Sequence, residues 1–217
     1  MNDAPPRRIR SYVRRERPLK AGAIATLERL WPRFGIEPLL WPGLGQGGRA
    51  LVLDIGFGDG EALLTMAEGD PLRDYVGVEM YRTGLIKVLR GIEEQKLINV
   101  RLIQADAKGV IALVGDGRLD VVHVFFPDPW PKSRHHKRRL VCLEFLDEIA
   151  RILRPGGLFH MATDWAPYAE EVILMFADHT AFLRAPEGRG GRPMTKFERR
   201  GQRLGHASHD LRFLKVG

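Results

Sequence analysis

Acidic residues occur in this sequence at the points where apolar, strand-like segments end. They are Asp54, Glu79, Asp106, Asp128 and Asp164. Capping of helix N-termini explains many acids in such places, but capping alone does not readily explain one at each of five consecutive segments. Because parallel strands bring their carboxyl ends to one edge of a sheet, we expect these carboxylates to line a common ligand site.

A glycine-rich turn follows the first acid, and its spacing narrows the choice of ligand. Asp54 precedes Gly56, Gly58 and Gly60, but Glu61 stands where the dinucleotide-binding fingerprint needs its last glycine. No lysine follows the glycines, as a phosphate-binding P-loop would require. Clustered carboxylates would repel a pyrophosphate, whereas S-adenosylmethionine offers an amine, a sulfonium and a ribose diol. The turn and the acids therefore favour S-adenosylmethionine, which the glycines allow to approach the backbone closely.

Strand-like and helix-like segments alternate around these acids, as their positioning requires. The strand-like segments are residues 50–56, 75–80, 99–106, 119–126 and 158–164. The helix-like segments are residues 61–68, 84–95, 140–153 and 166–179. Near-continuous apolar strands that alternate with helices are typical of a parallel sheet covered on both faces, so the pattern predicts an α/β fold.

The C-terminal part of the chain departs from this alternation. The strand-like segments 180–186 and 209–216 have no crossover helix between them, which predicts an antiparallel pair at the edge of the sheet. The connecting residues 188–206 are rich in Gly and Arg, so we expect them to form a functional loop outside the core.

Composition limits the class of protein and its partners. A net charge of +7 and a pI near 9.8 favour a polyanionic partner, with nucleic acid ahead of a membrane surface. No apolar run reaches the roughly 18–20 residues that cross a bilayer. The single Cys142 excludes a disulfide framework and fits a reducing cytoplasm. Neither the adjacent pair His135 and His136 nor the pair His206 and His209 completes a metal site, so we expect no metal.

The segment after the fourth strand-like run combines an acid, a rigid backbone and dense positive charge. Asp128 lies between Pro127 and Pro129, which fix the local backbone, and Trp130 follows. The basic residues that come next are Lys132, Arg134, His135, His136, Lys137, Arg138 and Arg139. A run of cations directly after the end of a strand suits contacts to phosphates. Trp130 either stacks on an everted base or packs on the end of the sheet.

Three motifs together resemble the bacterial tRNA (guanine-N7)-methyltransferase family. They are FFPDPWPKSRHHKRR at 125–139, ATDWAPYAEE at 162–171 and RPMTKFERRGQRLGH at 192–206. IRSYVRR, at residues 9–15, extends the resemblance towards the N-terminus, whereas residues 21–50 carry little of it. The length and order of these motifs make the resemblance specific.

The resemblance implies a fold, a reaction and a partner. The fold is a Rossmann-like class I methyltransferase: a seven-stranded, mostly parallel sheet with helices on both faces and an antiparallel C-terminal edge hairpin. The reaction is transfer of a methyl group from S-adenosylmethionine to N7 of guanine 46 in the variable loop of tRNA. Residues 21–217 would form the single methyltransferase domain, preceded by a basic, flexible arm at 1–20. The enzyme would be cytoplasmic, as a monomer or a homodimer.

The resemblance also assigns roles to individual residues. Cofactor binding falls to Asp54, Gly56, Gly58, Gly60, Glu79, Asp106 and Asp128. Asp54 and the glycines would face the methionine moiety, Glu79 the ribose hydroxyls and Asp106 the adenine amino group. Asp128 would also be catalytic. Substrate binding falls to Lys132, Asp164, Thr195 and Glu198, and RNA binding to Arg134, His135, His136, Lys137, Arg138 and Arg139. One departure is Asp54, because the family often has Glu there, which leaves the methionine contact open in detail.

Two alternatives stay open at this point. The first is another class I RNA methyltransferase, for example an amino-group methylase with a [DN]-P-P-[YFW] motif, which the order P-D-P-W of residues 127–130 matches imperfectly. The second is a basic RNA-binding protein that has the fold without catalysis. The acids and the glycine turn argue against the second, because a pure binder would not need them.

Overall fold

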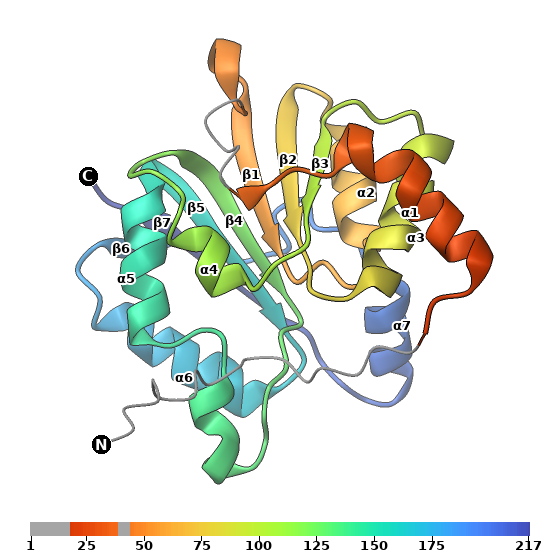
Figure 1. The fold of residues 1–217 in the computed structure, drawn as a ribbon. Coiled ribbons are helices and arrows are strands. Elements are labelled where there is room, and N and C mark those ends of the chain that lie inside the picture. The colour runs from red at the N-terminus through yellow and green to blue at the C-terminus, as the bar shows by residue number, and fades with distance from the viewer. Residues whose placement is uncertain (1–17, 39–43) are drawn as a thin grey trace, which may run out of the picture.

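A single sheet organises the part of the chain that the structure, a computed structural model, describes, residues 18–38 and 44–217 (Figure 1). Most of the predicted N-terminal arm lies outside these residues. The strands are β1 (Ala50–Ile55), β2 (Arg73–Val78), β3 (Val100–Ile103), β4 (Leu119–Phe125), β5 (Leu153–Thr163), β6 (Phe182–Arg184) and β7 (His209–Lys215). Their order across the sheet is β3-β2-β1-β4-β5-β7-β6.

The direction of the strands matches the sequence pattern. β1 to β5 pair in parallel, whereas β7 runs antiparallel to both β5 and β6. The predicted parallel sheet and the antiparallel pair at its edge are therefore confirmed. Chain order reverses between β1 and β4, and ligands of open α/β sheets bind at the carboxyl ends of strands at such a switch point.

Helices cover both faces of the sheet. They are α1 (Ala21–Phe34), α2 (Glu61–Gly69), α3 (Arg82–Glu94), α4 (Ala107–Ile111), α5 (Leu143–Ile152), α6 (Ala166–Ala177) and α7 (Lys196–Arg203), with short 3₁₀ helices η2 (Gln46–Gly48) and η3 (Ser133–Arg138). In Figure 1, α1, α2 and α3 lie on one side of the sheet and α4, α5 and α6 on the other. None of the helices in the described residues is long and apolar enough to cross a membrane.

Each face buries its own apolar cluster. On one side α3 contributes Leu85, Leu89 and Ile92 at helical spacing, against strands whose side chains are almost completely buried. On the other side Phe145 of α5 and Tyr168 of α6 pack in the second cluster. Continuous burial of β1 between these clusters holds the switch point rigid.

Segment 188–206 differs from its prediction as a loop outside the core. It contains the helix α7, and the charged side chains of Arg192 and Glu198 are buried. Composition misled the prediction because Arg and Glu are almost never buried unless they pair with one another, and here they do.

Candidate active site

Two cavities lie at the carboxyl edge of the sheet, beside the switch point. The larger, about 530 Å³, is lined by residues 56–62, by Asp54 and by Thr195–Phe197. The smaller, about 190 Å³, is lined by Glu79, Asp128 and neighbouring apolar residues. Gly56 and Phe126 line both, so the two cavities adjoin. Of the predicted cofactor and substrate residues, Asp54, the three glycines of the turn, Glu79, Asp128 and Thr195 line these cavities, whereas Asp106, Lys132, Asp164 and Glu198 line neither of them.

Asp54 forms the floor of the larger cavity. Its side chain is 1% exposed, and within the described residues neither carboxylate oxygen has a hydrogen-bond partner. Burial, with a smaller contribution from the charge of Glu79, raises the pKa of Asp54 to about 7. A buried carboxylate without a partner is unfavourable unless a cation or donor reaches it. The site therefore fits the ammonium group of S-adenosylmethionine.

The three glycines of the turn have two different roles. Gly56 and Gly58 have φ values of 69° and 57°, and a Cβ added at either would have no described atom within 4 Å. Their backbones thus border open space in the cavity, as close approach to a cofactor requires. Gly60 also lines the cavity, but a Cβ there would come within 2.0 Å of Val88 in α3. Gly60 is needed for packing between the turn and α3.

Glu79 both faces the smaller cavity and shapes the turn. Its Oε2 accepts a hydrogen bond from the backbone N–H of Gly58 (3.1 Å), and its Oε1 accepts from Met80 (2.6 Å) and Tyr81 (3.0 Å). These bonds fix the orientation of the carboxylate. Both lone pairs of Oε1 are therefore occupied, whereas Oε2 keeps one lone pair that can accept from a ribose hydroxyl, so the predicted role is compatible with this geometry through Oε2.

Asp106 caps a helix as well as bordering the smaller cavity. Its Oδ1 accepts from the backbone N–H of Lys108 (2.9 Å) at the start of α4, and its neighbours Ala105 and Ala107 line the cavity. Capping therefore occupies one oxygen and leaves the other for an adenine amino group. That contact remains a prediction.

Asp128 lies at the tip of a strained turn. Phe126 and Trp130, on either side of residues 127–129, have φ values of +51° and +45°. A side chain in this left-handed region costs roughly 1–2 kcal/mol, and such strain is concentrated at functional sites. Partial burial raises the pKa of Asp128 above its ordinary value. The prolines could be read from the sequence, but the positive φ values could not.

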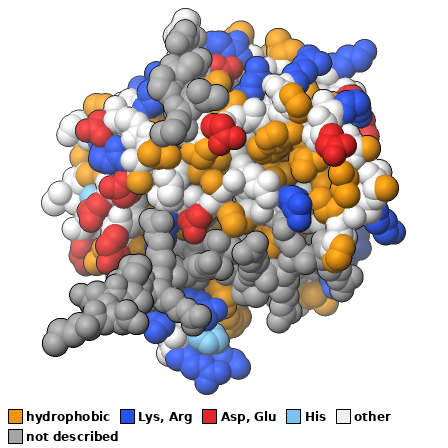
Figure 2. Space-filling model, viewed as in Figure 1, with side chains coloured by type: hydrophobic (Ala, Val, Ile, Leu, Met, Phe, Trp, Pro, Cys, Tyr) orange, Lys and Arg blue, Asp and Glu red, His pale blue; other side chains and the backbone are white. Residues whose placement is uncertain are grey.

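The basic segment, residues 132–138, projects beside this turn. Figure 2 shows Lys, Arg and His side chains gathered at the lower end of the molecule, where Figure 1 places this segment. The side chains of Lys132, Arg134 and Lys137 are exposed. The guanidinium of Arg138 lies 4.9 Å and the centre of the His135 ring 5.8 Å from the centre of the Trp130 ring, so Trp130 packs on the basic segment, which decides neither of the two roles expected for it.

Arg139 does not belong with the basic segment, although we had assigned it to RNA binding. Its side chain is buried, its Nε donates to the carbonyl oxygen of Pro129 (2.9 Å), and it pairs with Glu171. Its guanidinium also lies 4.7 Å from the centre of the Tyr168 ring. Since the side chain has no path to a phosphate, we correct its role to holding the turn that carries Asp128.

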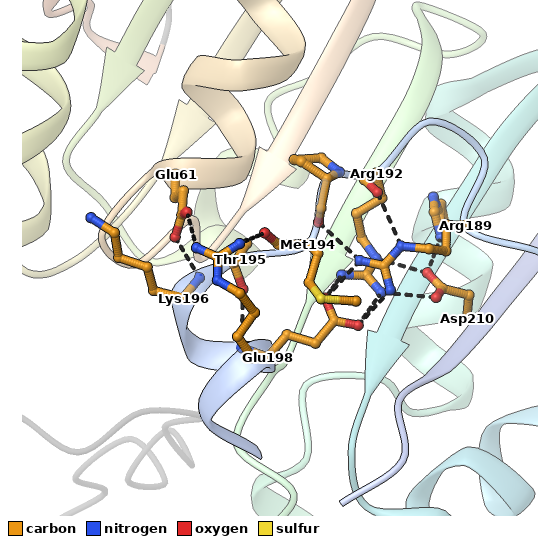
Figure 3. Close-up of polar contacts among 11 residues, drawn as sticks. Glu61, Arg189, Arg192, Met194, Thr195, Lys196, Glu198 and Asp210 are labelled. Atoms are coloured by element: carbon orange, nitrogen blue, oxygen red, sulfur yellow. Dashed lines mark hydrogen bonds and ion pairs between the residues drawn. The ribbon is translucent and has the colours of Figure 1, made fainter. Parts of the chain in front are cut away.

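The C-terminal segment reaches the larger cavity through Thr195 (Figure 3). The hydroxyl oxygen of Thr195 accepts from the backbone N–H of Glu198 (3.3 Å) and so caps α7. Glu198 was also predicted to bind the substrate, but both of its oxygens are occupied. Arg189 donates to them at 2.6 and 2.7 Å, and Arg192 at 2.8 and 3.1 Å.

These contacts set the charge and the role of Glu198. Burial alone would raise its pKa, but the hydrogen bonds from Arg189 and Arg192 outweigh burial and lower the pKa to about 2. The carboxylate is thus ionised and directed at arginines instead of the cavity, so the predicted guanine contact finds no support here. Asp164 remains accessible and lies 3.4 Å from Nδ1 of His206.

Within the described residues, no group of three or more His, Cys, Asp or Glu side chains lies close enough together to hold a metal ion.

Comparison with known proteins identifies the family. The model of a family described as "Putative methyltransferase" matches residues 48–211. A tRNA (guanine-N(7)-)-methyltransferase of Nitrosococcus oceani is 45% identical, over 96% of this chain and 91% of its own. A tRNA (guanine-N(7)-)-methyltransferase of Alkalilimnicola ehrlichii is 47% identical, over 96% of this chain and 93% of its own. This chain belongs to the tRNA (guanine-N(7)-)-methyltransferase family.

Solved structures confirm the methyltransferase fold of this family member. The 16S rRNA methyltransferase KamB matches with a TM-score of 0.57 at 19% identity, over 89% of this chain and 94% of its own. An rRNA methylase from Streptococcus thermophilus matches with a TM-score of 0.53 at 16% identity, over 82% of this chain and 93% of its own. As a member of the family, the methyltransferase uses S-adenosylmethionine, which the unpaired Asp54 and the open glycine turn fit.

Proposed function

We propose that this protein transfers the methyl group of S-adenosylmethionine to N7 of a guanine in tRNA, at position 46 of the variable loop. The observation that carries the choice of substrate is 45–47% identity, over 96% of the chain, to relatives named for this reaction. The cavities support the chemistry, because carboxylates at the carboxyl ends of β1, β2 and β4 surround the space where cofactor and base would meet.

Residues in and beside the two cavities hold and orient the cofactor. Asp54 accepts from its ammonium group, while Gly56 and Gly58 allow it to lie against the backbone. Glu79 accepts from the ribose hydroxyls and Asp106 from the adenine amino group. When bound, S-adenosylmethionine supplies an electrophilic methyl group on a sulfonium. Guanine N7 has a lone pair and no proton, so the chain needs alignment at roughly 3–3.5 Å and no general base.

Asp128 and Asp164 accept from the ring N–H and amino group of guanine, whose donor-rich edge matches carboxylates. They also stabilise the positive charge that the ring acquires during transfer, the reverse in sign of an oxyanion hole. Thr195 accepts from its own helix, so its hydroxyl proton remains available to an acceptor on the base. Lys132, which is exposed beside Asp128, binds the substrate from the outer side.

The basic segment supplies the contacts to the RNA backbone that bring the guanine to this edge. Residues 21–217 act as one methyltransferase domain, which the basic sequence of residues 1–20 precedes. A tRNA substrate places the enzyme in the cytoplasm.

The deciding experiment is methyl transfer from labelled S-adenosylmethionine to a tRNA transcript, followed by chemical cleavage at 7-methylguanine. We expect a single cleavage site at guanine 46, and no label in a matched transcript with adenine at that position. Label at another nucleotide, or only on ribosomal RNA or protein, would overturn the acceptor. Failure to bind S-adenosylmethionine in isothermal titration would instead favour a non-catalytic RNA-binding protein.

A further inference from the structure

Glu61 joins two elements that are far apart in the sequence. It is the first residue of α2, directly after the glycine turn, and it faces the start of α7 (Figure 3). Its Oε2 accepts from the backbone N–H of Lys196 (2.6 Å), and its Oε1 accepts from the guanidinium of Arg199 (3.1 Å). One carboxylate therefore holds both the backbone and a side chain of the first turn of α7.

The start of α7 needs such a partner. The first N–H groups of a helix have no acceptor within the helix, and negative charge is favourable beside them. Thr195 satisfies the N–H of Glu198, and Glu61 satisfies that of Lys196. The helix has little apolar burial to hold it, since Glu198 is its buried side chain and Phe197 is 57% exposed. Polar contacts therefore decide where α7 sits.

A second anchor holds α7 from the other side. Arg192 links Glu198 of α7 to Asp210 of β7 through paired hydrogen bonds, and this cluster is buried. It fixes the segment to the sheet but does not touch the glycine turn. Glu61 thus links the glycine turn to α7, beside the contact between the rings of Phe126 and Phe197 (5.1 Å), and it lines the same cavity as Thr195.

We infer that Glu61 is a positioning residue that couples cofactor binding at the glycine turn to the placement of α7 and Thr195. The inference rests on the proposed function for the identity of the two ligands. A ligand that orders residues 56–60 also orders Glu61, and through it the segment that meets the guanine. By linkage, tRNA strengthens cofactor binding by the same factor. The ion pair to Arg199 is weak by itself, because the side chains are 34% and 43% exposed, so the bond to Lys196 contributes more.

The first test measures this coupling directly. The affinity for tRNA is determined with and without S-adenosylhomocysteine, which fills the site without turnover. We expect the wild-type protein to bind tRNA roughly fivefold or more tightly with the ligand, and Glu61→Ala, which removes both acceptor oxygens, to bring that ratio close to one. Glu68→Ala, a change of an exposed acid in the same helix, is the matched control and should keep the wild-type ratio. A purely structural defect would weaken both affinities equally; an unchanged ratio in Glu61→Ala, or a wild-type ratio of one, would overturn the inference.

The second test needs no tRNA and so separates this inference from the proposed function. Hydrogen exchange of peptides covering residues 196–203 is followed on addition of S-adenosylhomocysteine. We expect ligand-induced protection in the wild-type protein and in Glu68→Ala, but not in Glu61→Ala, and weaker protection in Arg199→Gln. Equal protection in wild type and Glu61→Ala would refute the coupling even if tRNA is methylated. Loss of protection in Glu61→Ala would support it even if the acceptor proves to be another RNA.

Discussion

At the scale of one residue, Asp54 lowers the stability of the empty protein and provides a carboxylate for cofactor binding. Its carboxylate is buried beside Glu79 without a described partner, so ionisation is costly in the empty protein. Its pKa of about 7 lies above that of an unfolded aspartate, near 3.9. Its contribution to stability is therefore fully present below about pH 4 and is lost as the pH rises to about 7.

Asp54→Asn should separate these two effects. Without cofactor at pH 8 we expect the variant to be more stable than the wild type by about 4 kcal/mol, the value that corresponds to a pKa difference of about three, because the buried charge is removed. At pH 5 the difference should shrink, since the wild-type side chain is then mostly neutral. Affinity for S-adenosylmethionine should fall by at least about tenfold, as expected for a lost charged hydrogen bond. Thermal melting at both pH values and isothermal titration check these outcomes; equal melting temperatures at pH 8 would contradict them.

Asp128 should act on turnover more than on binding. We expect Asp128→Asn to lower kcat about a hundredfold or more, because it removes the charge that stabilises the methylated ring, with little change in the Kd for tRNA. Partial desolvation raises the pKa of Asp128, so wild-type activity should fall with decreasing pH from a higher pH than an aspartate of ordinary pKa would give. The pH profile of kcat tests the second point. A comparable loss of tRNA affinity would show that Asp128 mainly binds RNA.

At the scale of elements, the buried charges of Arg192, Glu198 and Asp210 fix the segment that carries α7. Burial opposes ionisation of both acids, but hydrogen bonds from Arg192 outweigh it and lower the pKa values of Glu198 and Asp210. Their contribution to stability is thus present above about pH 4 and is lost as the pH falls towards 2.

Arg192→Gln should release this segment. Removing one member of a buried charge cluster leaves the others without compensation, so we expect a loss of about 3–5 kcal/mol of unfolding free energy. Denaturant unfolding and limited proteolysis within residues 186–208 measure it. Arg200→Gln, a change at an exposed position of α7, is the control and should remain within about 0.5 kcal/mol of the wild type. Similar stability of the two variants would mean that the cluster does not hold the segment.

The elements that the sequence predicted are those with strong apolar patterns. The segment 119–126 became β4 almost to the residue, and 140–153 contains α5. The helix α1 has only Thr26, Leu30 and Phe34 buried, which is too weak a pattern to detect without its partner α3. Sequence patterns locate elements that carry their own apolar face and miss those that depend on distant partners.

The same distinction explains what was predictable about the site. Acids at strand ends could be placed because parallel topology alone brings Asp54, Glu79 and Asp128 together. Arg139 and Glu198 looked like surface residues, and their burial depends on Glu171, 32 residues away, and on Arg192. Composition could not show those pairings.

At the scale of the whole molecule, the positive charges behind the net charge of +7 are unevenly distributed. Many arginines are paired with carboxylates, as Arg151 is with Asp116 and Glu148. Residues 132–138 are different, because their cations project from one end of the molecule (Figure 2). This distribution suits a substrate whose phosphates approach at the mouth of the site.

Neutralising that end should change the salt dependence of RNA binding. For the triple variant Arg134→Gln, Lys137→Gln, Arg138→Gln we expect weaker tRNA binding, with a slope of log K against log[salt] shallower by about 2, since each lost phosphate contact removes roughly 0.7–0.9. Arg139→Gln is the contrasting control: its slope should stay unchanged while kcat falls, because it holds the turn of Asp128. Filter binding at several salt concentrations measures the slope for each variant. A wild-type slope in the triple variant would show that the basic segment does not contact RNA phosphates.

The positive φ values of Phe126 and Trp130 constrain how this protein can vary. Glycine would suit both backbones, but it would abolish the contacts that the rings make with Phe197 and Arg138. Any other side chain would keep the strain and change the contact. At both positions the backbone conformation favours glycine, whereas the contacts require a large aromatic ring, and few amino acids satisfy both requirements. In a saturation library selected for activity, these two aromatic positions should tolerate as little change as Asp128, although neither is assigned a chemical role.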